Sequence, residues 1–190
     1  MKFKIFNIFL LLVLLQNCSY YSFKGSIPSH ISSVVISPLK NETSEYMISD
    51  LLNEKFMDLL LVENILDIVS FENADSKLDI IIISLTDKPN IYTIDTNTDY
   101  EIVNEWKITM NIKIIWYDLI NNENIVEKNI LEWATYSLGI DIGKDNLDND
   151  LDGLIDEEDN DEYGIPREGA MRIAIDKVSK TIINELTSTW

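Results

Sequence analysis

Carboxylates crowd one short stretch of the sequence, residues 141–162. The stretch holds eleven acidic residues and one base, Lys144. At its centre, Asp148, Asp150 and Asp152 alternate with other residues and are followed by Gly153. Alternate carboxylates in a tight loop converge on one point, and glycine permits the sharp turn that such a loop needs. Because Ca²⁺ prefers about six to eight oxygen ligands of this kind, the stretch predicts a calcium site.

The full spacing, Asp-x-Asp-x-Asp-Gly-x-x-Asp, is that of an EF-hand-type calcium loop. It also resembles the calcium repeats of thrombospondin type 3 and dockerin modules. The predicted ligands are five carboxylates and one backbone carbonyl: Asp148, Asp150, Asp152, the carbonyl of Leu154, Asp156 and Asp159. Asp159 stands where a bidentate glutamate is usual, which is expected to weaken affinity. The alternative is a solvated acidic loop, and we favour calcium because so many unneutralised carboxylates would repel one another.

The second residue with distinctive chemistry is Cys18, the single cysteine of the chain. It follows a basic start, Met1 to Lys4, and an apolar run from Ile5 to Leu15. That run is much shorter than the roughly 20 residues of a spanning helix, so residues 1–17 are predicted to be a signal peptide. The position of Cys18 resembles the lipobox of bacterial lipoproteins, whose cysteine carries acyl chains such as palmitate. Leu15 fits this pattern and Asn17 departs from it; a chance cysteine after an ordinary signal peptide is the alternative.

The composition limits the function classes. The formal net charge is −18, and it becomes −20 when the signal peptide is removed with its two lysines. This balance argues against nucleic acid and against a general attraction to anionic membrane surfaces. The single histidine, His30, cannot form a metal cluster or a catalytic triad, and no nucleophile elbow or phosphate loop is present. The sequence therefore predicts a protein that is not an enzyme.

The elements that must position these residues follow from periodicity. Apolar residues at helical spacing predict amphipathic helices from Ile48 to Leu60 and from Pro166 to Trp190. Strict alternation from Trp106 to Trp116 predicts a long strand with one face on the core. Further strands are expected at Ile31–Ile36, Ile65–Val69, Leu78–Leu85 and Ile125–Tyr136, with Asp87–Asn90 ending the strand at Leu85 and Asn121–Asn124 forming a hairpin turn.

The predicted fold is α+β, a mixed four- or five-stranded sheet with both helices packed on one face. Residues 18–30 would be a lipidated tether. Residues 31–190 would form a single domain, with residues 141–165 as an acidic insertion between the last strand and the last helix.

Several short motifs resemble the lipopolysaccharide-assembly lipoprotein (LptE-like) family. They are the run from Cys18 to Gly25, Ile27-Pro28, Val34–Pro38, Asn41–Thr43, Ala74-Asp75 with Leu78, Pro89 with Tyr92, and Glu105–Ile108. The resemblance implies a non-catalytic outer-membrane lipoprotein at the periplasmic face. Such a protein plugs an LptD-like β-barrel translocon, and members of the family also bind lipopolysaccharide.

No lipopolysaccharide-binding residues can be carried over from the family. Lys107 and Lys113 are the clustered bases on the solvent face of the long strand, and we favour ordinary solvated lysines there. The acidic insertion departs from the family pattern. It keeps a second function open, a surface-tethered calcium-binding adhesion or scaffold lipoprotein.

Overall fold

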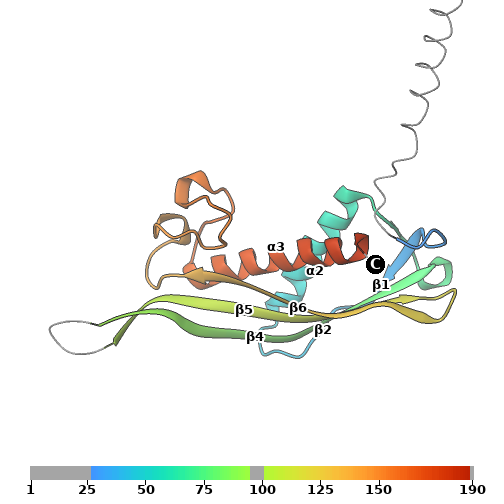
Figure 1. Cartoon of the computed structure of the whole chain (residues 1–190), viewed down its shortest axis with the longest axis horizontal. Coiled ribbons are helices and arrows are strands. Elements are labelled where there is room, and N and C mark those ends of the chain that lie inside the picture. Colours follow the sequence, from blue (N-terminus) through green and yellow to red (C-terminus); the bar gives the residue numbers. More distant parts are fainter. Residues whose placement is uncertain (1–26, 95–100, 189–190) are drawn as a thin grey trace, which may run out of the picture.

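The computed structural model describes residues 27–94 and 101–188. The predicted signal peptide, Cys18 and the tether up to residue 26 lie outside the described residues. Six strands form one mixed sheet in the order β3-β1-β4-β5-β6, with β2 paired to β4 (Figure 1). The strands are β1 (Ser33–Ile36), β2 (Lys40–Asn41), β3 (Asp67–Ile68), β4 (Ser76–Ile94), β5 (Glu101–Asp118) and β6 (Glu123–Tyr136).

Two helices, α2 (Met47–Glu63) and α3 (Pro166–Thr187), cover the same face of this sheet (Figure 1). Helix α2 turns Ile48, Leu52, Phe56 and Leu60 inward, and each is at most 1% exposed. These residues recur every four positions, which places them on one side of an α-helix. Short 3-10 turns occur at Phe71–Asn73, Ile142–Lys144 and Asp156–Glu158. The predicted α+β fold, with both helices on one face, is confirmed.

The core lies between the helices and the long antiparallel strands. Ile108, Met110, Ile112, Ile114 and Trp116 of β5 are all fully buried, as their alternation predicts. The parallel half of the sheet is shorter, because β1 pairs with β3 and β4 over only a few residues. The predicted strand at Ile65–Val69 is therefore reduced to β3, and the short β2 was not predicted.

The predicted end of the strand at Asp87–Asn90 is wrong, because β4 continues through this segment to Ile94. Pro89 lacks an N–H and would disrupt a central strand. On the side of β4 that faces away from β5, however, β1 and β2 pair only as far as Ile82. Pro89 pairs with Trp106 of β5, so along this part of its length β4 is an edge strand, where proline is tolerated.

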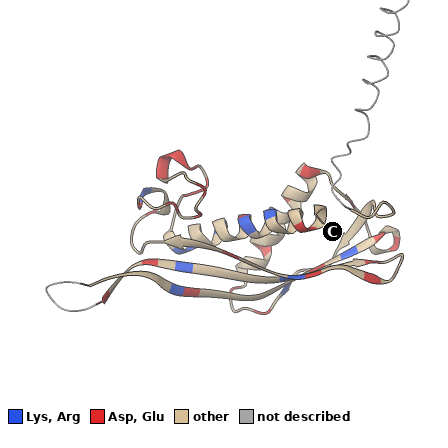
Figure 2. Ribbon diagram, viewed as in Figure 1, with Lys and Arg blue, Asp and Glu red and all other residues tan. Residues whose placement is uncertain are grey.

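The segment through which the chain enters the domain and the acidic insertion lie toward opposite ends of β5. At one end, His30 contacts Asp118, so the chain enters the domain there. Toward the other end of β5, Trp106 pairs with Tyr136, the last residue of β6, after which the chain leads into the insertion. The distance along β5 is roughly 40 Å at about 3.4 Å per residue. Figure 2 shows the acidic residues of the insertion toward the end of the molecule that also carries the β4–β5 hairpin.

Within residues 27–94 and 101–188, neither α2 nor α3 is apolar over a stretch long enough to cross a bilayer.

Candidate metal centre

The acidic insertion is attached to the domain at its two ends. Ile142 is fully buried and belongs to the hydrophobic core. Its N–H donates to the carbonyl of Gly164 at 3.1 Å, so the beginning and the end of the insertion are paired. Gly169 of α3 lies directly against the Ile142 side chain, and a Cβ at position 169 would overlap it. The insertion therefore starts from a packed position on α3.

Asn149 attaches the middle of the insertion to β6. It is fully buried and lies between two predicted ligands, Asp148 and Asp150. Its carbonyl accepts from the Thr135 N–H at 2.9 Å, and its side-chain amide donates to the Thr135 carbonyl at 2.9 Å. The Asn149 N–H donates to Glu162 Oε1 at 2.6 Å. These bonds hold the acidic loop against the edge of the sheet.

Five carboxylates gather into two overlapping groups around this attachment. Asp150, Asp152 and Asp159 form one group, and Asp148, Asp150 and Glu162 form the other. In each group the candidate ligand oxygens lie within 4.8 Å of one another. Two oxygens bound to one Ca²⁺ at 2.3–2.6 Å can be up to about 5 Å apart, so either group could share a cation.

The side chain of Asp159 gives an independent test of the fit to a cation. Asp159 is only 7% exposed, and its Oδ2 is buried without a hydrogen-bond partner among the described residues. A buried carboxylate oxygen without a partner is costly, and a bound cation would satisfy it. The donor set, all hard oxygens, suits Ca²⁺. The residues present therefore fit the predicted ion.

The electrostatics of the cluster reflect carboxylates that are close together and partly buried. Burial raises the pKa of Glu162 to about 7, although the N–H groups of Asn149 and Asp156 act in the opposite direction. The neighbouring carboxylate of Asp159, followed by burial, raises the pKa of Asp161 to about 6. Burial also raises the pKa of Asp150. A divalent cation would supply the positive charge that this cluster needs.

Backbone N–H groups wrap the first part of the loop around its carboxylates. Asp148 accepts from the N–H groups of Asp152 and Gly153 at 3.1 and 3.0 Å. The N–H of Leu154 donates to Asp152 Oδ1 at 2.8 Å. Gly153 has φ +97°, in the left-handed region that favours glycine, so the predicted sharp turn at this residue is confirmed.

Four of the six predicted ligands, Asp148, Asp150, Asp152 and Asp159, enter the two groups. Asp156 enters neither group, and its Oδ1 accepts from the Asn146 N–H at 3.1 Å. The carbonyl of Leu154 stays a prediction. Glu162 was missed because it lies three residues beyond the end of the expected spacing, and its acidic character was the only signal.

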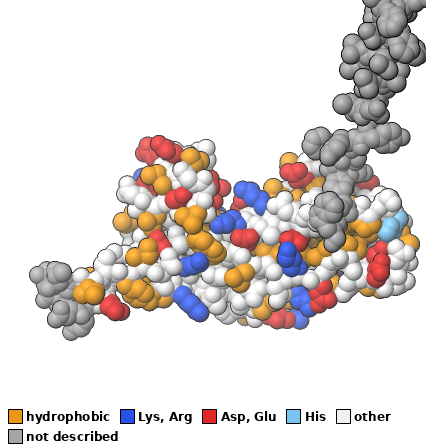
Figure 3. Space-filling view, viewed as in Figure 1, with side chains coloured by type: hydrophobic (Ala, Val, Ile, Leu, Met, Phe, Trp, Pro, Cys, Tyr) orange, Lys and Arg blue, Asp and Glu red, His pale blue; other side chains and the backbone are white. Residues whose placement is uncertain are grey.

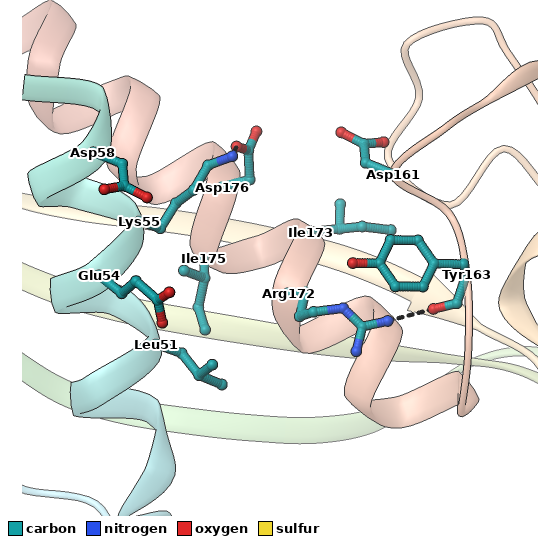
Figure 4. Close-up of a pocket in the computed structure, with 10 residues that line it drawn as sticks. All are labelled: Leu51, Glu54, Lys55, Asp58, Asp161, Tyr163, Arg172, Ile173, Ile175 and Asp176. Carbon is teal, nitrogen blue, oxygen red and sulfur yellow. Dashed lines mark hydrogen bonds and ion pairs between the residues drawn. The ribbon is translucent and has the colours of Figure 1, made fainter. Parts of the chain in front are cut away.

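A cavity of about 310 Å³ lies beside the insertion, between α2 and α3 (Figure 4). Two pairs of the polar residues that line it contact each other, Lys55 with Asp176 and Arg172 with Tyr163. Burial would raise the pKa of Asp176, but Lys180 and Lys55, at 2.6 and 2.5 Å, lower it. Arg172 stacks over the Tyr163 ring at 4.4 Å and donates to the Tyr163 carbonyl. The Lys55–Asp176 ion pair joins α2 to α3, and the Arg172–Tyr163 contacts attach the insertion to α3.

The two lysines considered for lipopolysaccharide already have partners within the domain. Lys107 Nζ lies 3.6 Å from the centroid of the Trp133 ring. Lys113 Nζ lies 2.6 Å from Glu127 Oε1. These contacts favour ordinary strand lysines at both positions.

Comparison with known proteins places the fold among solved bacterial structures. No protein-family model matches the sequence, and no curated protein matches it. Hypothetical protein CT253 from Chlamydia trachomatis has a TM-score of 0.52 at 14% identity, over 84% of this chain and 97% of that chain. Protein XCC0632 from Xanthomonas campestris, of family DUF330, has a TM-score of 0.50 at 7% identity, over 85% and 87%. A minor lipoprotein from Acinetobacter baumannii has a TM-score of 0.45 at 10% identity, over 83% and 93%.

The likenesses to CT253 and XCC0632 concern the fold alone, because sequence identities this low carry no information about function. None of the three names refers to lipopolysaccharide assembly or to calcium. A role in lipopolysaccharide assembly and the binding of calcium therefore stay predictions.

Proposed function

We propose that this chain is a non-catalytic, lipid-anchored outer-membrane lipoprotein at the periplasmic face, the assembly or plug subunit of an LptD-like barrel translocon for lipopolysaccharide. Cys18 supports the anchor, because it directly follows a predicted signal peptide. Membrane attachment of this kind is durable, since each buried CH₂ of an acyl chain adds about 0.8 kcal/mol. The first described residue, Ile27, lies nine residues after Cys18, so a short tether would join the membrane to the domain.

The observation that supports a partner-binding role best is the free end of the β4–β5 hairpin. Beyond Trp106, and within the part of the chain that the structure describes, the two strands pair only with each other, because β6 ends at its pair with Trp106. This arm exposes large apolar side chains (Figure 3): Ile91 at 48%, Tyr92 at 50%, Ile94 at 68% and Ile102 at 49%. An isolated two-stranded hairpin is marginally stable in water, and exposed apolar patches mark interaction sites. The arm therefore suits insertion into a partner.

Purification of the tagged full chain from detergent-solubilised membranes tests this function. An outer-membrane barrel should co-purify, and its recovery should fall when Ile94→Asp and Ile102→Asp are combined, because charge would enter the apolar arm. Ile120→Asp is a matched control, since Ile120 is 53% exposed but lies beside Asp118 at the opposite end of β5. Depletion of the chain should also reduce lipopolysaccharide delivery. The proposal fails if no barrel is recovered, or if the arm variant and the control recover it equally.

A second candidate function, a surface-tethered calcium-dependent adhesion or scaffold lipoprotein, is supported by Asp159 Oδ2, which has no hydrogen-bond partner among the described residues. Isothermal titration of the full chain with Ca²⁺ should give heat that is lost in Asp150→Ala plus Asp152→Ala. The variant Glu157→Ala plus Glu158→Ala removes the same charge from exposed residues outside both groups and should bind normally.

Chelation separates the two functions. A translocon subunit should keep its barrel partner when calcium is removed, whereas an adhesion module should lose its ligand. Absence of Ca²⁺ binding by the wild-type chain would reject the second function and leave the first to the co-purification experiment.

A further inference from the structure

Strand β6 forms one edge of the sheet, and part of its outward backbone is free. Thr135 faces outward, since its N–H donates to Asn149 and not to β5. Hydrogen-bonding direction alternates along an antiparallel strand, so every second residue before Thr135 also faces outward. These residues are Glu127, Asn129, Leu131 and Trp133. Within the described residues, no hydrogen bond is made to their outward backbone groups.

The free part of this edge has two structural limits. At its beginning, the register shifts between the pairs Trp116–Val126 and Tyr117–Asn124, which leaves Ile125 as a bulge. At its end, Asn149 covers Thr135. The regular free edge therefore runs from residue 126 to residue 134, and Ile130 lies at its centre.

We propose that β6 pairs antiparallel with β6 of a second copy of this chain, about a two-fold axis at Ile130. In this register Lys128 of each copy faces Glu132 of the other. Opposite charges directly across a strand pair are stabilising, and like charges are destabilising. The neighbouring registers that keep the same backbone alternation place Lys128 opposite Ile130 or Ala134. Charge complementarity therefore favours the register that is centred on Ile130. The two limits of the free edge, residues 126 and 134, favour the same centre.

The same register covers an exposed apolar side chain. Leu131 is 61% exposed on the face of the sheet opposite the helices. The two copies of Leu131 become diagonal neighbours across the new strand pair, within reach of each other. The pairing also adds about eight backbone hydrogen bonds between the four outward residues of each copy.

Existing contacts hold the two charged side chains at this edge. Lys128 Nζ lies 2.6 Å from Glu185 Oε1 of α3, and Thr181 Oγ1 donates to Glu132 Oε1 at 2.7 Å. Both side chains therefore lie on the helix-covered face. On this face Lys128 of one copy would lie opposite Glu132 of the other. Edge strands often carry charges that prevent pairing. Here the two charges have opposite signs and exchange places under the two-fold rotation, so they favour it.

Sedimentation of the detergent-solubilised full chain over a range of concentrations tests the proposal. The wild-type chain should form a concentration-dependent dimer. Leu131→Pro removes an outward N–H that β5 does not use, which edge strands tolerate, and it should abolish the dimer. Leu131→Ala keeps this N–H and is the matched control that should still dimerise. Circular dichroism establishes that each variant is folded.

Charge reversal provides a second test that does not depend on proline. Lys128→Glu or Glu132→Lys alone should weaken dimerisation roughly tenfold, because two ion pairs become repulsive, and the double reversal should restore it. A chain that stays monomeric at every concentration overturns the proposal. So does a dimer that tolerates both the single reversals and Leu131→Pro, because it must use another surface.

Discussion

His30 Nε2 lies 2.6 Å from Asp118 Oδ2, and this contact joins the segment before β1 to the end of β5. The carboxylate of Asp118 also accepts from the N–H groups of Ile120 and Asn121 at 2.8 and 2.9 Å. The side chain of Asp118 is 2% exposed. One buried carboxylate thus holds together the entry of the chain and the turn between β5 and β6.

Asp118 should make the domain sensitive to acid. Burial by itself would raise its pKa, but hydrogen bonds from Asn121, His30 and Ile120 outweigh burial and lower the pKa to about 2, from 3.8. A carboxyl whose pKa is lowered by folding contributes stability that is present above its unfolded pKa and lost as pH falls through the folded one. The wild-type melting temperature should therefore decrease between pH 4 and pH 2.

Asp118→Asn should decrease the free energy of unfolding by about 1–3 kcal/mol at neutral pH. The melting temperature of this variant should also decrease less between pH 4 and pH 2 than that of the wild type. Thermal unfolding at a series of pH values measures both effects. Asp50→Asn, on the exposed side of α2, should keep the wild-type profile. Parallel acid profiles for wild type and Asp118→Asn would contradict this account.

Gly143→Ala should disturb the acidic insertion. A Cβ at this position would overlap the backbone carbonyl of Glu162, which cannot move as a flexible side chain could. Because Glu162 belongs to one of the carboxylate groups, we expect a lower melting temperature and weaker Ca²⁺ binding. Differential scanning calorimetry and isothermal titration measure these changes. Lys144→Ala, at the exposed neighbouring residue, should leave both properties unchanged; unchanged behaviour of Gly143→Ala would mean that the Glu162 backbone adjusts freely.

Two substitutions in α2 compare its buried and exposed sides. Phe56 is fully buried, so Phe56→Ala should decrease the free energy of unfolding by about 3–5 kcal/mol. Leu61 is 64% exposed in the same helix, and Leu61→Ala should change it by less than about 0.5 kcal/mol. Urea unfolding measures both values. Similar effects would mean that α2 does not pack through this face.

Cys18→Ser should remove the protein from the membrane fraction without unfolding it. Cys18 lies outside the described residues, and the hydrophobic core is built from residues after the predicted tether. Fractionation with detection of the chain measures its location, and thermal unfolding checks the domain. A variant that stays wholly with membranes would mean either that lipidation does not occur or that a partner alone retains the protein.

Much of the architecture was predictable because it depends on local periodicity. The burial of Phe56 and its neighbours follows from a four-residue spacing, and the burial of Ile112 follows from alternation. Pro89 misled the prediction, since a proline ends a central strand but not an edge strand. The position of a strand within a sheet depends on which other strands reach it, and that was not visible along the chain.

For the candidate metal centre, the sequence by itself determined that carboxylates alternate around a glycine. It therefore determined the type of ligand and the turn at Gly153. Only the tertiary structure decided that Glu162 joins Asp148 and Asp150, and that Asn149 attaches the loop to Thr135. The physical reason is that spacing determines contacts within one turn of backbone. Contacts between residues more than ten positions apart depend on how the insertion packs against β6 and α3.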